Sequence, residues 1–249
     1  MTLVISLLIF VLSFISGMLG LGVAFVAIPV LGLFGLDLIH VIMPLALLLN
    51  GLTSVSGAIA FLRRKMVDLR LGLPLLAICT AAAPLGVYLL RFVSTTTVWW
   101  VFVAALVFIA ARMIFPPKMS DKDEVNVPPR NKAIAMAAGF FIAVLAGFLG
   151  VGPGFLMMPT LVLVGYPARL AAATNALIVT LPSFSAFLGH LGTARVDPVL
   201  LASTSVAGVA GAWLGAVFMA KKVRSRTLAM IFGFVLIGLA IQRVWLLLT

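Results

Sequence analysis

The stretch Gly-Phe-Leu-Gly-Val-Gly-Pro-Gly-Phe-Leu-Met-Met-Pro, from Gly147 to Pro159, decides the fold because the chain contains two versions of it. The other version, Gly-Met-Leu-Gly-Leu-Gly-Val-Ala-Phe-Val-Ala-Ile-Pro, runs from Gly17 to Pro29 and keeps three glycines, the phenylalanine and the proline in matching places. Glycines weaken an apolar helix and let the backbone approach other groups closely, and Pro153 suits the first turn of a new helix. The duplicated stretch therefore predicts a broken helix in each half of the chain.

The composition indicates an integral membrane protein. Of the 249 residues, 64% are hydrophobic and 9% are charged, and the mean hydropathy is +1.30. A soluble domain is roughly half apolar and about a quarter charged. Apolar runs of helical length recur along the whole chain, which favours a bundle of transmembrane helices over a β-barrel. In lipid, a broken helix is tolerated only where protein or a watery cavity bonds to the freed backbone groups.

The apolar runs predict an all-α membrane protein of about ten helices. Their predicted ranges are 2–20, 22–34, 40–62, 71–90, 97–115, 132–150, 153–165, 170–191, 199–220 and 227–248. The second and the seventh are too short to cross about 30 Å of hydrocarbon comfortably. Full crossing and a re-entrant half-helix are both open for each of these two.

A polar linker divides the chain into two transmembrane repeats of five helices. Residues 116–131 contain proline pairs and mixed charges, which are typical of an exposed linker. The repeats, 1–115 and 132–249, match beyond the glycine stretch, because Val67-Asp68 and Val196-Asp197 hold equivalent positions. We therefore expect one membrane domain built from two related halves.

The basic residues predict how the chain is oriented. The net charge of +11 comes from 17 basic residues that lie mainly in short loops. That distribution follows the positive-inside rule and argues against nucleic-acid binding. If Arg63, Arg64 and Lys65 are cytoplasmic, the central linker is cytoplasmic as well. Because each repeat has an odd number of helices, the two repeats then have inverted topology, provided that each short helix is paired as a hairpin.

Inverted repeats with broken helices are an architecture of secondary transporters, which bind substrate near the midplane of the membrane. Here the paired segments 17–31 and 147–161 are followed by Ala173-Thr174-Asn175 and by the short Val-Asp loops. In this order the motifs resemble the sulfite exporter TauE/SafE family over essentially the whole chain. The resemblance implies a multi-pass protein of the bacterial inner membrane that moves small anions, notably sulfite and organosulfonates, with export as the expected direction.

We expect the anion to bind where the two broken helices expose backbone N–H groups and the positive ends of their dipoles. Hydroxyl and amide side chains complete the predicted site. The predicted substrate-binding residues are Gly20, Gly22, Ala24, Asn50, Thr53, Gly150, Gly152, Gly154, Thr174 and Asn175. Two alternatives stay open, because glycines in membrane helices also mediate close packing and Thr or Ser hydroxyls often bond to their own helix. An amide such as that of Asn175 is costly in an apolar helix without a partner.

The sequence offers little for other kinds of function. His40 and His190 are the only histidines and Cys79 is the only cysteine, so we expect no metal site, no intrachain disulfide and no cofactor. The scarcity of ionisable residues inside the helices disfavours a membrane enzyme. No Gly-x-x-x-x-Gly-Lys-Ser/Thr loop occurs, so a gradient must drive transport unless a partner supplies ATP. The sequence leaves open whether the protein is an anion channel, which ion is coupled to transport, and whether the protein forms a homo-oligomer.

Overall fold

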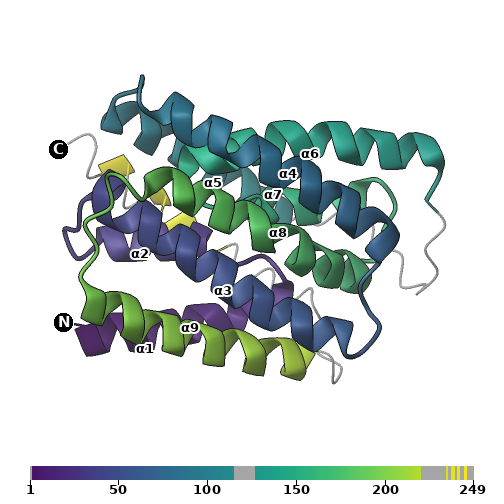
Figure 1. The fold of residues 1–249 in the computed structure, drawn as a ribbon, viewed down its shortest axis with the longest axis horizontal. Helices are drawn as coiled ribbons and strands as arrows, with labels where there is room; N and C mark the ends of the chain where they lie inside the picture. The colour runs from purple at the N-terminus through teal and green to yellow at the C-terminus, as the bar shows by residue number, and fades with distance from the viewer. Residues whose placement is uncertain are drawn as a thin grey trace.

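A computed structural model of the protein describes residues 2–114 and 127–219, together with isolated positions between 234 and 245. Every element in this described part is a helix (Figure 1). The elements are α1 (Thr2–Leu19), α2 (Ala24–Gly32), the π-helix η1 (Leu38–Ile42), α3 (Met43–Leu62), α4 (Leu69–Leu90), α5 (Thr95–Ile114), α6 (Pro129–Leu149), α7 (Gly154–Leu163), α8 (Ala168–His190) and α9 (Pro198–Met219).

The first nine predicted helices each overlap one of the helices α1 to α9, with ends that differ by a few residues. The predicted tenth, 227–248, lies outside the described residues apart from the isolated positions, as does most of the predicted linker at 116–131. The sequence did not predict η1. The π-helix η1 leads directly into α3, so that Leu38–Leu62 forms one long apolar segment.

Six of the described helical segments are long and apolar enough to cross a membrane. The helices α2 and α7 are too short, because nine and ten residues rise only about 14–15 Å against about 30 Å of hydrocarbon. A full crossing by either short helix is therefore excluded on length. The protein is a multi-pass membrane protein with two helices that are too short to cross the hydrocarbon on their own.

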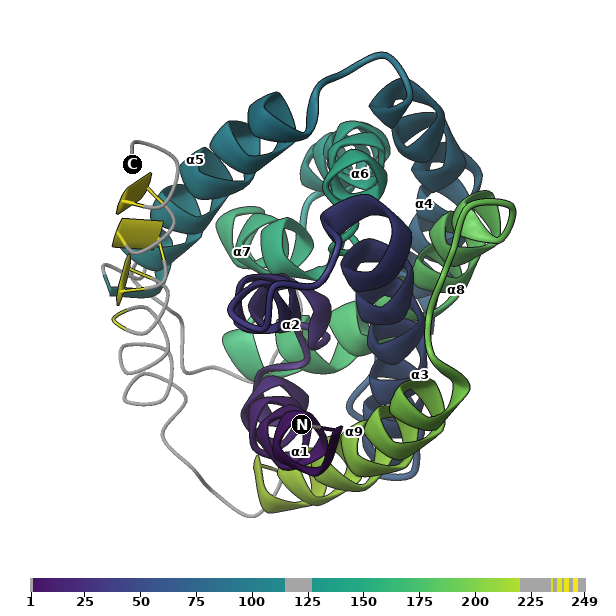
Figure 2. The ribbon, with the colours of Figure 1, turned by 90° about the vertical axis from the view of Figure 1, so that its left-hand side faces the viewer.

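The long helices surround the two short ones. In Figure 1, α1 and α9 lie along one side of the molecule, α4 and α6 lie along the other, and α3 and α8 lie between them. Figure 2, a view along the bundle, shows α2 and α7 near its middle. Phe10 and Phe14 of α1 face Gly211 and Gly215 of α9 in the same order, so these two helices are parallel. The order of the contacts between α4 and α6 shows in the same way that these two helices are parallel to each other. Both run opposite to α1 and α9 (Figure 1).

Close packing at glycines holds these helix pairs together. Gly17 of α1 contacts the backbone of Ala212 in α9, and Gly147 of α6 contacts the backbone of Ala83 in α4. Gly86 of α4 packs in the same way against α6. Small residues that allow backbones to touch are the usual basis of helix association in lipid, where the hydrophobic effect offers little. The α1–α9 and α4–α6 contacts are therefore alike in chemistry as well as in geometry.

Each broken segment turns the chain back on itself. After α1 the chain passes through Gly20 and Gly22, both with positive φ, and α2 then begins beside Asn50. Asn50 lies two turns into α3, and residues 33–42 connect the end of α2 to the start of that helix. The helix α2 thus returns toward the end of the bundle at which α1 began. The pair α1–α2 enters and leaves the bundle at the same end.

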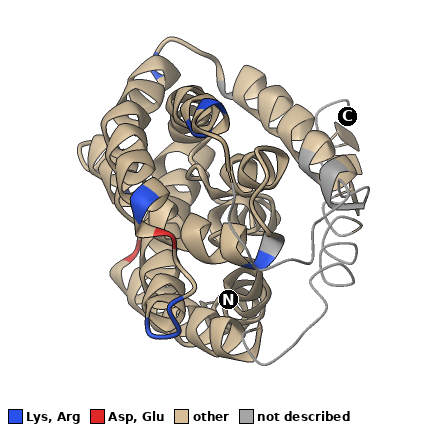
Figure 3. Cartoon of the chain, turned by 90° about the vertical axis from the view of Figure 1, so that its right-hand side faces the viewer, with Lys and Arg blue, Asp and Glu red and all other residues tan. Residues whose placement is uncertain are grey.

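Basic residues gather at the end of the bundle where α4, α6 and α8 begin, which Figure 3 views face on. The described basic residues at this end are Arg63, Arg64, Lys65, Arg70, Arg130, Lys132 and Arg169. Asp68 organises the loops there, because its side chain caps α4 through the N–H of Arg70 (2.9 Å) and accepts the Tyr166 hydroxyl (2.7 Å). Burial and this hydrogen bond raise the pKa of Tyr166, which keeps the phenol protonated as the donor. The opposite end has only Arg91 and Arg195 among the described basic residues.

Replacing Gly86 with leucine should destabilise the protein, because the new side chain collides with the backbone of α6 at Val144. Overpacking of this kind costs about 1–3 kcal/mol. We expect a lower melting midpoint of the purified protein in detergent and a smaller monodisperse fraction in size-exclusion chromatography. Gly192→Ala is the control, since a Cβ at that glycine meets open space. Equal melting midpoints for the two variants would contradict the close packing.

Candidate functional site

The two helix breaks meet at the middle of the bundle. Gly20 and Gly22 have φ values of +64° and +77°, and Gly150 and Gly152 have nearly the same values, +69° and +70°. Such left-handed backbone is open to glycine at no steric cost, which explains why the sequence needs glycine at each of these four places. Gly154, the first residue of α7, packs against the backbone carbonyl of Leu21 in the other break.

Aromatic packing fixes the two short helices side by side. The rings of Phe25 in α2 and Phe155 in α7 stack with their centroids 6.3 Å apart and an angle of 20° between their planes. Both rings are buried. Offset stacking of this kind adds to the burial of apolar area. The starts of α2 and α7 are thereby held close to each other.

Asn175 of α8 joins the two breaks. Its Nδ2 donates to the carbonyl oxygen of Gly20 (2.7 Å) and to that of Gly154 (2.9 Å). The side chain is fully buried. Because Nδ2 faces two acceptors, the orientation of the amide is fixed by its hydrogen bonds. One side chain therefore satisfies carbonyl groups in both broken segments.

Asn50 of α3 bonds to the same region from the other side. Its Oδ1 accepts the N–H of Ala24 at the start of α2 (2.9 Å), and its Nδ2 donates to the hydroxyl of Ser183 in α8 (2.9 Å). A Cβ added at Gly22 or at Gly152 would collide with this amide. The two glycines thus allow both breaks to approach one asparagine.

The electrostatic field at the meeting point comes from the backbone. Both α2 and α7 begin here, so the N-terminal ends of two helix dipoles converge, each worth about half a positive charge. The described polar side chains around them, those of Asn50, Asn175 and Ser183, are neutral. Converging positive helix ends without a buried basic side chain form a place that suits a small anion.

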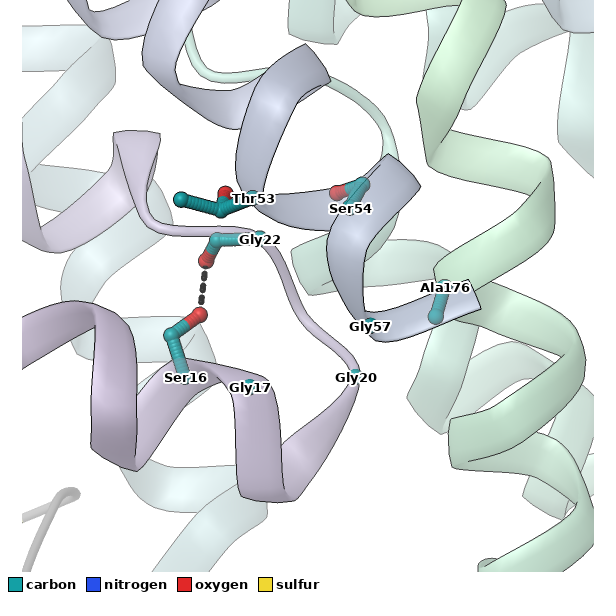
Figure 4. A pocket seen from close by; sticks show the side chains of 8 residues that line it. All are labelled: Ser16, Gly17, Gly20, Gly22, Thr53, Ser54, Gly57 and Ala176. Atoms are coloured by element: carbon teal, nitrogen blue, oxygen red, sulfur yellow. Dashed lines mark hydrogen bonds between the residues drawn. The ribbon is translucent and has the colours of Figure 1, made fainter. Parts of the chain in front are cut away.

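A small cavity opens beside the first break, as Figure 4 shows. It has about 210 Å³ of empty space, its open side included, and its interior has room for about one water-sized species. The cavity is lined by Ser16, Gly17, Gly20, Gly22, Thr53, Ser54, Gly57 and Ala176. Three of these residues contribute hydroxyl groups, and two of the three come from α3.

The family model described as sulfite exporter TauE/SafE matches residues 5–243. The chain belongs to the sulfite exporter TauE/SafE family. It is 24% identical to the probable membrane transporter protein YunE of Bacillus subtilis (strain 168) over 212 residues, which cover 78% of this chain and 76% of the relative.

A second relative, the probable membrane transporter protein YdhB of the same organism, is 25% identical over 218 residues, which cover 86% of this chain and 89% of YdhB. No solved structure matches the chain significantly. This member of the TauE/SafE family is therefore a membrane transporter whose substrate the comparisons do not identify.

Most of the predicted site residues of this TauE/SafE protein lie together around the two breaks. The residues in or beside the breaks, or bonded to them, are Gly20, Gly22, Ala24, Asn50, Gly150, Gly152, Gly154 and Asn175. Thr53 lines the cavity, and its hydroxyl donates to the carbonyl of Asn50 (3.2 Å). Thr174 differs, because its hydroxyl accepts the N–H of Asp68 (3.0 Å) and so holds the start of α4.

Sequence reasoning missed two hydroxyl groups of this region. Ser16 donates to the carbonyl of Gly22 across the first turn of the break. Ser183 accepts from Asn50 and donates to the carbonyl of Val179 (2.7 Å). A signal for Ser183 was present, since it occupies the position in the second half that Ser54 occupies in the first. Among the described residues, no group of His, Cys, Asp or Glu is arranged to hold a metal ion.

Asn175→Leu should lower the stability of the protein, because the carbonyls of Gly20 and Gly154 lose their amide donor. Each buried polar group that loses its partner costs about 1–3 kcal/mol. We expect a clear fall in the melting midpoint of the purified protein. Asn131→Leu is the matched control, since that amide is half-buried and donates to a single carbonyl, that of Val164 (3.1 Å). If both variants melt alike, Asn175 does not hold the breaks together.

Proposed function

We propose that this protein is a secondary transporter of small anions, with sulfite or an organosulfonate as substrate. The observation that carries the proposal is the meeting of the N-terminal ends of α2 and α7 at glycine-rich breaks in the middle of the bundle. A small oxyanion has several acceptor oxygens, which match backbone N–H groups and the amide donors of Asn50 and Asn175. The predicted substrate-binding residues form the proposed site, with Thr174 acting on it through the start of α4.

In this proposal the halves 1–115 and 132–249 are inverted repeats that share the site and expose it to the two sides of the membrane in turn. Three observations support it: α1 and α6 run in opposite directions, each half has a short helix after a glycine break, and the Gly17–Ala212 contact has a counterpart at Gly147–Ala83. Alternating access by two such halves is the usual mechanism of transporters with this architecture. The linker 116–131 connects the halves.

We further propose that the protein lies in the bacterial inner membrane with its basic end in the cytoplasm. The support is the concentration of Lys and Arg at the end where α4, α6 and α8 begin, as the positive-inside rule requires of cytoplasmic loops. Export is the proposed direction. An anion approaching from the cytoplasm is attracted by this end before it reaches the breaks.

Purified protein reconstituted into vesicles should move sulfite in a saturable way. Gly152→Ala should lower the rate by about tenfold or more, because a left-handed backbone with a Cβ is strained by about 1–3 kcal/mol and the Cβ collides with Asn50. Sulfite release from loaded vesicles measures the rate, with Gly192→Ala as the control. Sulfite on the opposite side of the membrane accelerates sulfite release through a carrier but does not accelerate release through a channel. Absence of flux of sulfite and of organosulfonates would refute the proposal.

The proposed orientation can be tested with single cysteines in a Cys79→Ala background. Arg64→Cys lies in the basic loop after α3, and Thr193→Cys lies in the loop after α8 at the other end. Both positions are exposed. In intact cells a membrane-impermeant maleimide should label only the cysteine at position 193, and the one at position 64 should react after permeabilisation. The reverse pattern would place the basic end outside.

A further inference from the structure

The cavity beside the first break sits against the last turn of α1, to which Ser16 and Gly17 belong. The C-terminal end of a helix carries about half a negative charge, and its last carbonyl groups have no partners within the helix. None of the eight residues that line the cavity is charged. The end of α1 therefore brings partial negative charge to one side of this space, and the start of α2, two residues beyond Gly22, brings partial positive charge to the other.

The hydroxyl groups of the cavity are mostly committed as donors. Ser16 donates to the carbonyl of Gly22, which Figure 4 shows as a dashed line, and Thr53 donates to the carbonyl of Asn50. A hydroxyl has one proton and two lone pairs, so both oxygens keep lone pairs as acceptors after these bonds. These lone pairs are available to coordinate a small cation.

Ser54 supplies the observation that calls for a ligand. Its side chain is 3% exposed and lines the cavity, and its Oγ has no hydrogen-bond partner. A buried hydroxyl without a partner costs free energy that folding would otherwise avoid, and native proteins keep few of them. A species bound in the cavity would satisfy this oxygen.

We propose that the cavity binds one sodium ion, held by the hydroxyl oxygens of Ser16, Thr53 and Ser54 and by carbonyl oxygens at the end of α1. The size of the interior matches one water-sized species and excludes a three-oxygen anion in this conformation. All of the ligands are neutral oxygens, which suit a hard monovalent cation, whereas a calcium site draws on carboxylates. Sodium sites of secondary transporters use the same elements, namely unwound backbone carbonyls and the C-terminal ends of half-helices.

The second half does not repeat this site. The residues equivalent to Ser16 and Thr53 are Ala146 and Pro182, which have no hydroxyl. The hydroxyl that is kept, on Ser183, is occupied by Asn50 and Val179. The structure therefore assigns one sodium ion to each chain.

If the bound sodium ion is the coupling ion, transport needs no titratable side chain in the cavity. Its role as the ion that drives transport rests on the proposed anion transport, but its binding does not. The test is therefore a binding experiment that contains no sulfite. Purified full-length protein is melted in sodium chloride, potassium chloride or choline chloride at constant ionic strength.

Sodium should raise the melting midpoint of the wild type by ~2–6 °C in a saturable way, and the other two salts should not. In Ser54→Ala this sodium-dependent rise should be lost, while the midpoint without sodium stays the same or increases because an unsatisfied hydroxyl has been removed. Ser185→Ala is the matched control, since that hydroxyl is bonded to the carbonyl of Thr80 (2.9 Å) away from the cavity. It should keep the full sodium effect.

Binding of radioactive sodium to the same three proteins gives a second measurement, with one site expected in the wild type and in Ser185→Ala. A cavity that holds only water shows no sodium-specific shift in the wild type, and this result overturns the proposal. An unchanged sodium effect in Ser54→Ala also overturns it. Protein that moves sulfite but ignores sodium refutes the sodium site alone, whereas protein that binds sodium but moves no anion refutes the proposed function alone.

Discussion

Backbone groups that leave a helix inside a membrane must find partners in the protein, and this constraint shapes the rest of the structure. Each break frees carbonyl and N–H groups that lipid cannot satisfy. Asn175 takes two of the carbonyls, and Asn50 takes the N–H of Ala24. The glycines are needed so that both breaks can come within reach of these two amides. The ring of long helices keeps the breaks away from lipid.

The two asparagines both link the halves, but neither has an asparagine at the equivalent position of the other half. Each makes one bond within its own half, to Ala24 or to Gly154, and one bond across to the other half. Their equivalents in the other half are Val179 and Ala46, which are apolar. The backbone at the breaks is therefore nearly symmetric while the side chains that serve it are not. A site of this kind offers an anion different donors from its two sides, so the two halves need not play equal parts in binding.

The sequence was informative where the signal is local or repeated. Glycine spacing located both breaks, because positive φ requires a residue without a Cβ, and apolar runs located α1 to α9. It was less informative about partners across the bundle. Thr174 carries the residue type expected of a site, yet it bonds to Asp68 because the turn of α8 on which it lies faces the start of α4. The π-helix η1 and the Ser183 bond depend on how helices cross, which single-sequence periodicity does not encode.

The pattern of hydrogen bonds at the breaks bears on how an anion could couple binding to movement. At the breaks themselves, the bonds that cross between the halves are those from Asn175 to Gly20 and from Asn50 to Ser183, and the amide is the donor in both. An oxyanion is a stronger acceptor than a neutral carbonyl or hydroxyl, since bonds to charged groups are worth about 1.5–3 kcal/mol against about 0.5–1.5 kcal/mol for neutral pairs. In the proposed transporter an arriving anion therefore competes for the two amide donors. Once they turn to the anion, the two breaks lose these crosslinks and can shift relative to each other, while other bonds, such as that from Asp68 to Thr174, still join the halves. Substrate binding itself would then release the movement, and no side chain at the breaks needs to change its protonation state.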